Sequence, residues 1–441
     1  MANSASTYPR RVRSRIVLRS RLYLRGAWRM SVIVAAAILG GLAGAGYAHL
    51  SDLAMQAHDR LYALAKWPVL ALMPAGFALT TWLTLRFSPE SAGSGIPQVI
   101  AAAEQRWRGR WGGQRVTLRT AVWKVALSTW LYICGGSIGR EGPTVQVVAG
   151  IIRSLTRGLR GGPGRRAIIL AGGAAGIAAA FNTPIAGVVF AVEELARSFE
   201  KRAHATVILV VVVTGFTSYA VQGDYAYFGV ATGKDTLGAA WLFAPVIGVV
   251  GGLFGGLFAR IVALVTGPDE NPIWRWRRDH PVLFSGLCGL AAAAVALASG
   301  GLTFGAGYSE AKSLIQNHPA QGLAFGLWKL LANLAAAICG APGGLFSPSL
   351  AAGAGIGAAF ARAGFSIAGR DAVVLGMTSY LSGVVQSPLT SAVILMEMTR
   401  EPGLVGPLML AALVARWASG LIMPEPLYHM LSRNWRLQPD A

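Results

Sequence analysis

Charged residues are scarce in this 441-residue sequence: they make up 13% of it, about half the share found in soluble domains. Acidic residues are the rarer sign, with 19 Asp and Glu against 39 Lys and Arg. By contrast, 54% of the residues are hydrophobic and 56 are glycine, the residue that lets membrane helices pack backbone to backbone. This composition excludes an ordinary soluble domain, and we expect a chain whose solvent is mostly lipid.

Cysteine is also scarce. Cys134, Cys288 and Cys339 all lie in apolar runs, where we expect packing residues rather than disulfides or metal ligands. No cleavable signal peptide is evident, because residues 1–29 hold eight Arg and no acid and form a long basic arm instead of a short leading region. We expect this arm to be cytoplasmic and drawn to anionic headgroups, and residues 431–441 to form a short cytoplasmic tail.

The net charge of +20 is a feature of many nucleic-acid-binding proteins. Here, however, the basic residues occupy short stretches between apolar runs, which is the distribution that the positive-inside bias leaves in cytoplasmic loops. We therefore expect no nucleic-acid partner. The loops that we place in the cytoplasm are 106–119, 153–166, 197–202 and 275–278. The loops 223–238 and 301–322 carry little basic charge and are expected outside.

The apolar runs come in two lengths. Long runs cover 30–50, 66–86, 117–134, 205–222, 239–266, 281–300, 323–339 and 403–423. Shorter pieces, many broken by Gly or Pro, cover 93–103, 141–152, 167–180, 184–196, 346–360, 372–385 and 388–398. Pieces of 10–14 residues cannot cross a bilayer as straight helices, so we expect half-helices that end at mid-depth inside the protein.

The sequence repeats itself at a spacing of 205 residues. Trp123-Lys124 recurs as Trp328-Lys329, Cys134-Gly135 as Cys339-Gly340, Pro143 as Pro348 and, one residue out of step, Glu193 as Glu397. Two copies of one design with broken helices are typical of transporters with inverted repeats. We therefore predict an all-α polytopic membrane protein, with a transport domain over 30–430 and repeat halves at about 30–222 and 239–423.

The repeat separates scaffold from function. Glu193 is shared by both copies, so we expect it to cap or pair near a helix end. Glu194 aligns with Met398, and Glu141 aligns with Phe346. A polar residue present in only one copy needs a reason other than the fold.

Glu141 lies within Gly139–Pro143, at the predicted start of a broken helix. A helix N-terminus presents unpaired N–H groups and a positive dipole end, so it can hold an anion without a basic side chain. A carboxylate there can occupy the anion's place, and once protonated it loses that attraction. An ordinary glutamate that stabilises the helix dipole is the alternative, but an ionisable residue at membrane depth favours a gate and proton carrier.

Two more segments of this kind are Gly93–Pro97 and Gly343–Pro348. The first offers the hydroxyl of Ser94, unless Ser94 is a plain N-cap. The second offers the backbone N–H groups of Leu345 and Phe346. These neutral donors suit a fast pathway, because binding must offset dehydration and still release the ion.

Tyr428 lies near the end of the chain, in Pro426-Leu427-Tyr428. Its phenol can donate one hydrogen bond to an ion. A tyrosine of the interfacial aromatic belt is the common alternative.

The segments Gly93–Pro97, Gly139–Pro143 and Gly344–Pro348 resemble the three signature segments of the CLC family of chloride channels and chloride/proton exchangers. The likeness runs in the same order and spacing from about residue 30 to Tyr428. It implies a homodimer in a lipid bilayer, with one complete anion pathway in each subunit.

The resemblance also implies roles for individual residues. It implies a central chloride held by Ser94, Tyr428 and the N–H groups of Leu345 and Phe346, and an external chloride site near the backbone of Arg140 and Gly142, gated by Glu141. Glu194 falls where exchangers of the family carry an internal proton-transfer glutamate that passive channels usually lack, which favours a chloride/proton antiporter. The serine at position 94 argues against the fluoride-selective and nitrate-preferring branches. The short C-terminus resembles prokaryotic members, so a bacterial inner membrane is expected.

Two other functions remain open. One is a passive chloride channel with a protonation gate. The other is an intramembrane serine protease that uses Ser94, which would need a base within reach. The six histidines are predicted at segment ends or in loops: His49, His58, His204, His280, His318 and His429. A sodium-coupled carrier is not favoured because no acidic cluster suggests a sodium site, and we expect no enzymatic activity, cofactor or metal.

Overall fold

The computed structural model describes residues 10–104, 115–159, 163–195, 204–223, 228, 237–267, 271–316 and 322–436. Within these ranges every regular element is a helix, and one isolated β-bridge joins Gly139 to Gly344. The predicted all-α polytopic membrane fold is confirmed. Of the predicted loops and termini, 1–9, 106–114, 197–202, 224–227, 229–236, 317–321 and 437–441 lie outside the described residues.

The helices follow the predicted apolar runs closely. In the first half they are α1 (Arg10–Leu64), α2 (Val69–Phe87), η1 (Pro89–Ser91), α3 (Ile96–Glu104), α4 (Leu118–Ile133), α5 (Glu141–Thr156), α6 (Arg165–Phe181), α7 (Pro184–Phe190), the π-helical turn η2 (Ala191–Leu195) and α8 (His204–Gln222). In the second half they are α9 (Leu237–Thr266), α10 (Pro272–Asp279), α11 (Pro281–Ala298), α12 (Tyr308–Ile315), α13 (Gly322–Cys339), α14 (Phe346–Arg362), α15 (Gly369–Val385), α16 (Pro388–Thr399), η3 (Pro402–Leu404), α17 (Val405–Gly420) and α18 (Leu427–Arg436). Each predicted run contains a helix.

Six helical stretches are long and apolar enough to cross a membrane: Tyr23–Leu64, Val69–Phe87, Ala205–Gln222, Gly238–Thr266, Pro281–Ala298 and Pro402–Gly420. Others are far too short. The nine residues of α3 span about 14 Å, less than half of a hydrocarbon core. Yet α3 is buried from Ile96 to Ala103, so it ends inside protein and not in lipid.

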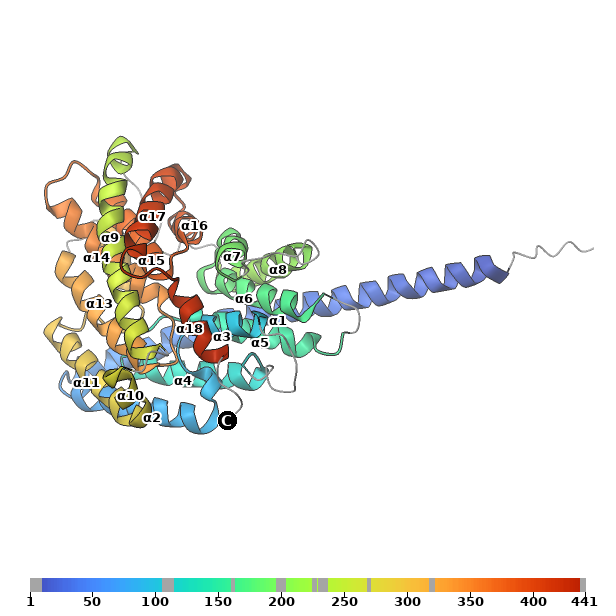
Figure 1. Cartoon of the computed structure of the whole chain (residues 1–441), viewed down its shortest axis with the longest axis horizontal. Helices are drawn as coiled ribbons and strands as arrows, with labels where there is room; N and C mark the ends of the chain where they lie inside the picture. The colour runs from blue at the N-terminus through green and yellow to red at the C-terminus, as the bar shows by residue number, and fades with distance from the viewer. Residues whose placement is uncertain are drawn as a thin grey trace, which may run out of the picture.

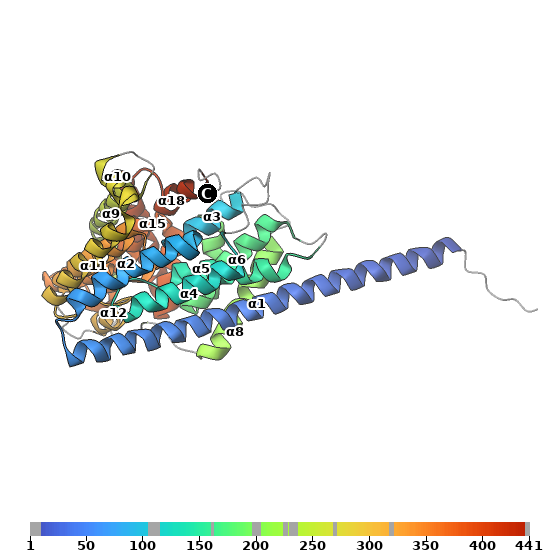
Figure 2. The same ribbon diagram turned by 90° about the horizontal axis from the view of Figure 1, so that it is seen from below.

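The first helix extends well beyond the body of the protein. Its 55 residues span about 80 Å, and its N-terminal part projects away from the other helices (Figures 1 and 2). The basic arm and the first apolar run therefore share one helix from Arg10 onward, without a break at residue 29. At the other end of the chain, α18 likewise runs past residue 430, and it packs against α3 (Figure 1).

The segment 301–322, predicted as an external loop, contains the helix α12. Its sequence alternates polar and apolar residues, which is why a search for apolar runs missed it. Gly307 precedes the helix with φ +79°, a left-handed conformation in which a side chain would be strained. The Nζ of Lys329 lies 2.9 Å and 2.7 Å from the carbonyl oxygens of Thr303 and Gly305 and so holds the turn that starts α12.

The two copies of the repeat meet at Gly139 and Gly344, which occupy equivalent positions. Each donates its N–H to the other's carbonyl, over 2.8 Å from Gly139 and 2.6 Å from Gly344. Two equivalent residues that bond each other reciprocally lie on either side of a local two-fold axis. The starts of α5 and α14 are thus joined directly.

A second pair of equivalent positions is formed by two buried lysines. Lys124 donates to the carbonyl oxygens of Ser91 and Gly93, both over 2.7 Å, just as Lys329 does at Thr303 and Gly305. The turn before α12 is therefore the counterpart of the turn before α3. Its spacing is 212 residues instead of 205, and this insertion hides the match from a search at fixed spacing.

The shared glutamates form a third reciprocal contact. Glu193 accepts the N–H groups of Leu389 and Thr390 at the start of α16, over 3.0 Å and 2.6 Å. Glu397 accepts those of Ile185 and Ala186 at the start of α7, over 3.2 Å and 2.6 Å. The prediction that Glu193 serves the fold as a cap is confirmed.

Candidate functional site

The N-terminal ends of α3, α5 and α14 come together in the interior. A Cβ built on Gly142 would collide with the Oγ of Ser94 and would lie 3.2 Å from the Cα of Gly344. This close approach requires glycine at position 142. The three glycine- and proline-rich segments therefore meet at one place.

The hydroxyls of Ser94 and Tyr428 face this place. Ser94 is 6% exposed and Tyr428 is fully buried, and their side chains lie within interaction range of each other. Neither hydroxyl has a hydrogen-bond partner among the described residues. Buried hydroxyls are normally satisfied, so two unsatisfied ones on adjoining helices indicate a site for something that both could bind.

Leu345 and Phe346 form the start of α14 beside Tyr428. Leu345 is the N-cap and Phe346 the first helical residue, and neither donates a backbone hydrogen bond within the described part of the chain. The ring of Phe346 stacks on that of Tyr428, with centroids 5.9 Å apart and planes 11° apart. The free N–H groups of a helix start thus adjoin the two hydroxyls.

Glu141 is the first residue of α5, and it is completely buried. Its Oε1 accepts the hydroxyl proton of Tyr308, and its Oε2 accepts the N–H of Ser347 over 3.4 Å. Ser347 is the second residue of α14, so the carboxylate lies against the positive end of α14 as well as at the start of its own helix. The carboxylate occupies a position in which a small anion would also be stable.

Arg140 turns its side chain toward α1. Its Nη1 donates to the carbonyl oxygen of Ala48 over 3.0 Å and to Oδ1 of Asp52 over 2.9 Å. Its guanidinium lies 5.5 Å from the ring centroid of Tyr308. The backbone of Arg140 and Gly142 therefore flanks Glu141, while the charge of Arg140 is engaged elsewhere.

Glu194 lies in η2, where it is 2% exposed. Its Oε2 accepts the hydroxyl proton of Ser387, and its backbone carbonyl lies 3.0 Å from Nε2 of the buried His429. His429 follows Tyr428, and Tyr428 lies within electrostatic range of both Glu141 and Glu194. The tyrosine thus links the surroundings of the two carboxylates.

The model of the voltage gated chloride channel family matches residues 75–420, which is most of the chain. This chain belongs to the voltage gated chloride channel (CLC) family.

Curated relatives and solved structures agree with this assignment. The chain is 30% identical to the H(+)/Cl(−) exchange transporter ClcA of Klebsiella pneumoniae and 27% identical to that of Citrobacter koseri, with 96% of this chain and 92% of each relative covered. Its fold resembles a slow cyanobacterial Cl−/H+ antiporter, with a TM-score of 0.79, 24% identity and coverage of 92% of this chain and 98% of the other. A CLC-type fluoride/proton antiporter matches with a TM-score of 0.77, 21% identity and the same coverage.

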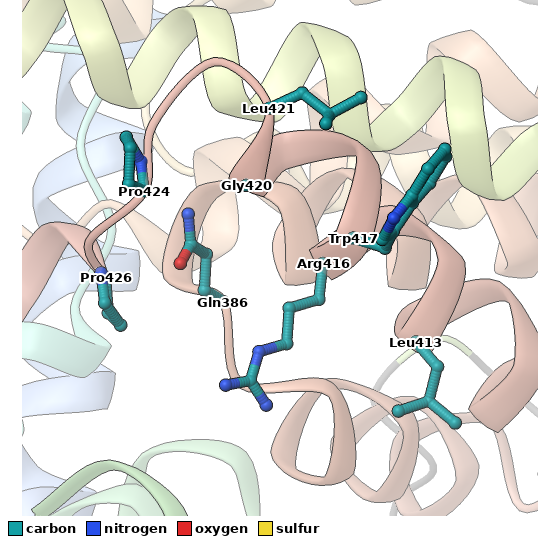
Figure 3. A pocket seen from close by; sticks show the side chains of 8 residues that line it. All are labelled: Gln386, Leu413, Arg416, Trp417, Gly420, Leu421, Pro424 and Pro426. Carbon is teal, nitrogen blue, oxygen red and sulfur yellow. The ribbon is translucent and has the colours of Figure 1, made fainter.

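This CLC protein has a surface pocket at the C-terminal end of α17 (Figure 3). The residues that line it are Gln386, Leu413, Arg416, Trp417, Gly420, Leu421, Pro424 and Pro426. Gln386 and Arg416 supply its long polar side chains. Gln386 precedes Ser387, the partner of Glu194, so the pocket opens on the Glu194 side of the protein.

A serine protease in this CLC protein has no geometric support. The hydroxyl of Ser94 has no partner in the described part of the chain, so no base adjoins it there. The expectation that no histidine lies inside an apolar run was wrong for His58, which is buried within α1 because its Nδ1 pairs with the carbonyl of Ile133, 3.0 Å away. Among the described residues, no cluster of His, Cys, Asp and Glu could hold a metal ion.

Two polar residues beside Glu141 escaped the sequence analysis of this CLC protein. Tyr308 and Ser347 contact each other through their hydroxyls, and both contact the carboxylate of Glu141. Tyr308 is the counterpart of Ile96, and Ser347 is the counterpart of Gly142. The glycine pattern at a spacing of 212 residues would have revealed the first, and the repeat at 205 the second.

Proposed function

We propose that this CLC protein exchanges chloride for protons and that Glu141 is its gate. The observation that carries the proposal is the carboxylate of Glu141, which is buried and accepts the N–H of Ser347 at the start of α14. A carboxylate at that position competes with chloride for the same donors. The relatives named H(+)/Cl(−) exchange transporters support exchange as the activity.

In this proposal chloride binds between Ser94, Tyr428 and the N–H groups of Leu345 and Phe346. These donors are neutral, so the ion is held by dipoles and released readily. Protonation of Glu141 removes the charge that draws its side chain to the helix ends, and chloride then takes its place. One proton therefore moves as chloride passes in the opposite direction.

Glu194 supplies the proton from the other side. Its carboxylate is held by Ser387, next to the pocket that Gln386 and Arg416 line. We expect water in this pocket to deliver protons to Glu194. The basic residues at the C-terminal end of α5 mark the same face as cytoplasmic under the positive-inside bias.

The test is paired chloride and proton flux from purified protein in liposomes. Wild type should drive protons uphill under a chloride gradient. Glu141→Ala should keep chloride flux and lose all proton flux, and Glu194→Gln should do the same. Glu397→Gln, a buried carboxylate of the scaffold, is the matched control and should keep coupling.

A passive chloride channel is the alternative. It predicts chloride flux with no proton movement in the wild type, and that result would replace the exchanger. Coupled flux that survives in Glu141→Ala would instead remove Glu141 from the mechanism.

We also propose a homodimer in a bacterial inner membrane. The reciprocal contact of α7 with α16 places Ile185 and Leu389, 58% and 45% exposed, on one apolar surface. Such a surface suits a second copy of the chain, and light scattering of the purified protein tests the dimer.

A further inference from the structure

We propose that Tyr308 and Ser347 form a latch that holds the carboxylate of Glu141 in its seated position and so sets how easily chloride displaces it. The inference rests on the proposed function, in which Glu141 competes with chloride. It adds two positioning residues that act through Glu141.

The latch stands on a chain of three contacts. The hydroxyl of Tyr308 bonds Oε1 of Glu141, and the same hydroxyl bonds Oγ of Ser347. A phenol has one proton, so it can donate to only one of these partners. An ionised carboxylate can only accept, so Tyr308 donates to Glu141 and accepts from Ser347.

The backbone of Ser347 closes the arrangement. Its N–H donates to Oε2 of Glu141, so each carboxylate oxygen has a donor. Both donors sit on rigid supports: Ser347 in the first turn of α14, and Tyr308 at the first position of α12. The turn before Tyr308 is held in turn by Lys329.

Neighbouring groups fix the tyrosine ring. The guanidinium of Arg140 lies 5.5 Å from its centroid, and Arg140 itself is paired with Asp52. The ring of Phe228 lies 6.2 Å away on another side. With the ring held, the hydroxyl has little freedom to leave the carboxylate.

The repeat shows that the fold does not need these hydroxyls. The counterparts of Tyr308 and Ser347 are Ile96 and Gly142, which carry no polar side chain. The latch therefore exists only on the side of the site where the carboxylate is seated. It also depends on charge, because a hydrogen bond to a carboxylate is roughly twice as strong as one between neutral groups, so protonation of Glu141 loosens it.

The test measures chloride binding to purified protein by isothermal titration calorimetry. Tyr308→Phe keeps the ring and removes the hydroxyl, so the carboxylate competes less well and chloride should bind about tenfold more tightly, the lower end for a lost hydrogen bond to a charged group. Ser347→Ala keeps the backbone N–H and removes only the indirect contact, so the gain should be roughly threefold. Ser347→Ala alone also tests the latch if Tyr308→Phe fails to fold.

Two comparisons make the result specific. In the Glu141→Ala background, Tyr308→Phe should leave chloride affinity unchanged, because the latch acts only through the carboxylate. Tyr380→Phe removes another buried tyrosine hydroxyl, one without a hydrogen-bond partner among the described residues, and should match wild type.

Each failure points to a different idea. If Glu141→Ala leaves chloride binding as in wild type, the proposed competition by Glu141 is wrong. If Glu141→Ala tightens binding but Tyr308→Phe and Ser347→Ala do not, the latch alone is wrong. A Tyr308→Phe effect that persists without Glu141 would make Tyr308 a direct ligand of the ion and overturn the latch.

Discussion

In the first half of the chain α3 begins after Gly93-Ser94-Gly95 and α5 begins with Glu141, whereas the matching starts in the second half carry Gly305-Ala306-Gly307 and Phe346. The backbones agree: each glycine-bounded turn is held by a buried lysine, and Gly139 and Gly344 bond each other. The side chains do not agree. The scaffold is therefore symmetric and the chemistry is asymmetric, so function resides in the positions where the copies differ.

The largest expected effect concerns the shared lysines. Lys124→Met and Lys329→Met each remove a buried ammonium that caps backbone carbonyls, and each should lower the free energy of unfolding by about 3 kcal/mol. Thermal unfolding in detergent measures this. The comparison is sharpened by transport, because Lys124 supports the turn of Ser94 and Lys329 supports that of Tyr308.

We expect Lys124→Met to weaken chloride binding and Lys329→Met to strengthen it, as Tyr308→Phe does. Equal changes of chloride affinity in both variants would contradict the division of roles between the halves. A stability loss in only one of them would contradict the symmetric scaffold.

The next effect concerns Gly142 and its counterpart Ser347. A methyl group at position 142 collides with Ser94, so Gly142→Ala should weaken chloride binding about tenfold, since overpacking costs roughly 1–3 kcal/mol. Position 347 already carries a side chain, so Ser347→Ala should fold and bind well. Chloride affinities from calorimetry decide the matter, and wild-type affinity in Gly142→Ala would show that Ser94 does not need to lie so close.

The smallest effect concerns the reciprocal caps. Glu193→Gln and Glu397→Gln should each lower the free energy of unfolding by about 1 kcal/mol, because a neutral amide caps a helix start less well than a carboxylate does. Both variants should keep the proton-to-chloride ratio of wild type in liposomes. If Glu193→Gln alone changed that ratio, Glu193 would belong to the proton pathway instead of the scaffold.

Most of the fold was accessible from the sequence because membrane helices announce themselves by apolar length. The runs, the broken helices and the 205-residue repeat all have helices at the predicted places. The helix α12 was missed because it is short and half polar, and the shift of its turn from 205 to 212 residues hides its kinship with α3. The continuation of α1 through the basic arm was also not evident, since charge pattern does not report helix length.

Local sequence identified Glu141, Ser94 and the start of α14 as candidate anion-binding groups, because glycine and proline fix where a helix begins and a helix beginning attracts anions whatever its surroundings. It could not say that Tyr308 and Ser347 meet at Glu141, or that Tyr428 stacks on Phe346. Those contacts join residues 39 to 206 positions apart. Only the packing of α12, α14 and α18 around the local two-fold axis decided them, because hydrogen bonds depend on distances that chain order does not contain.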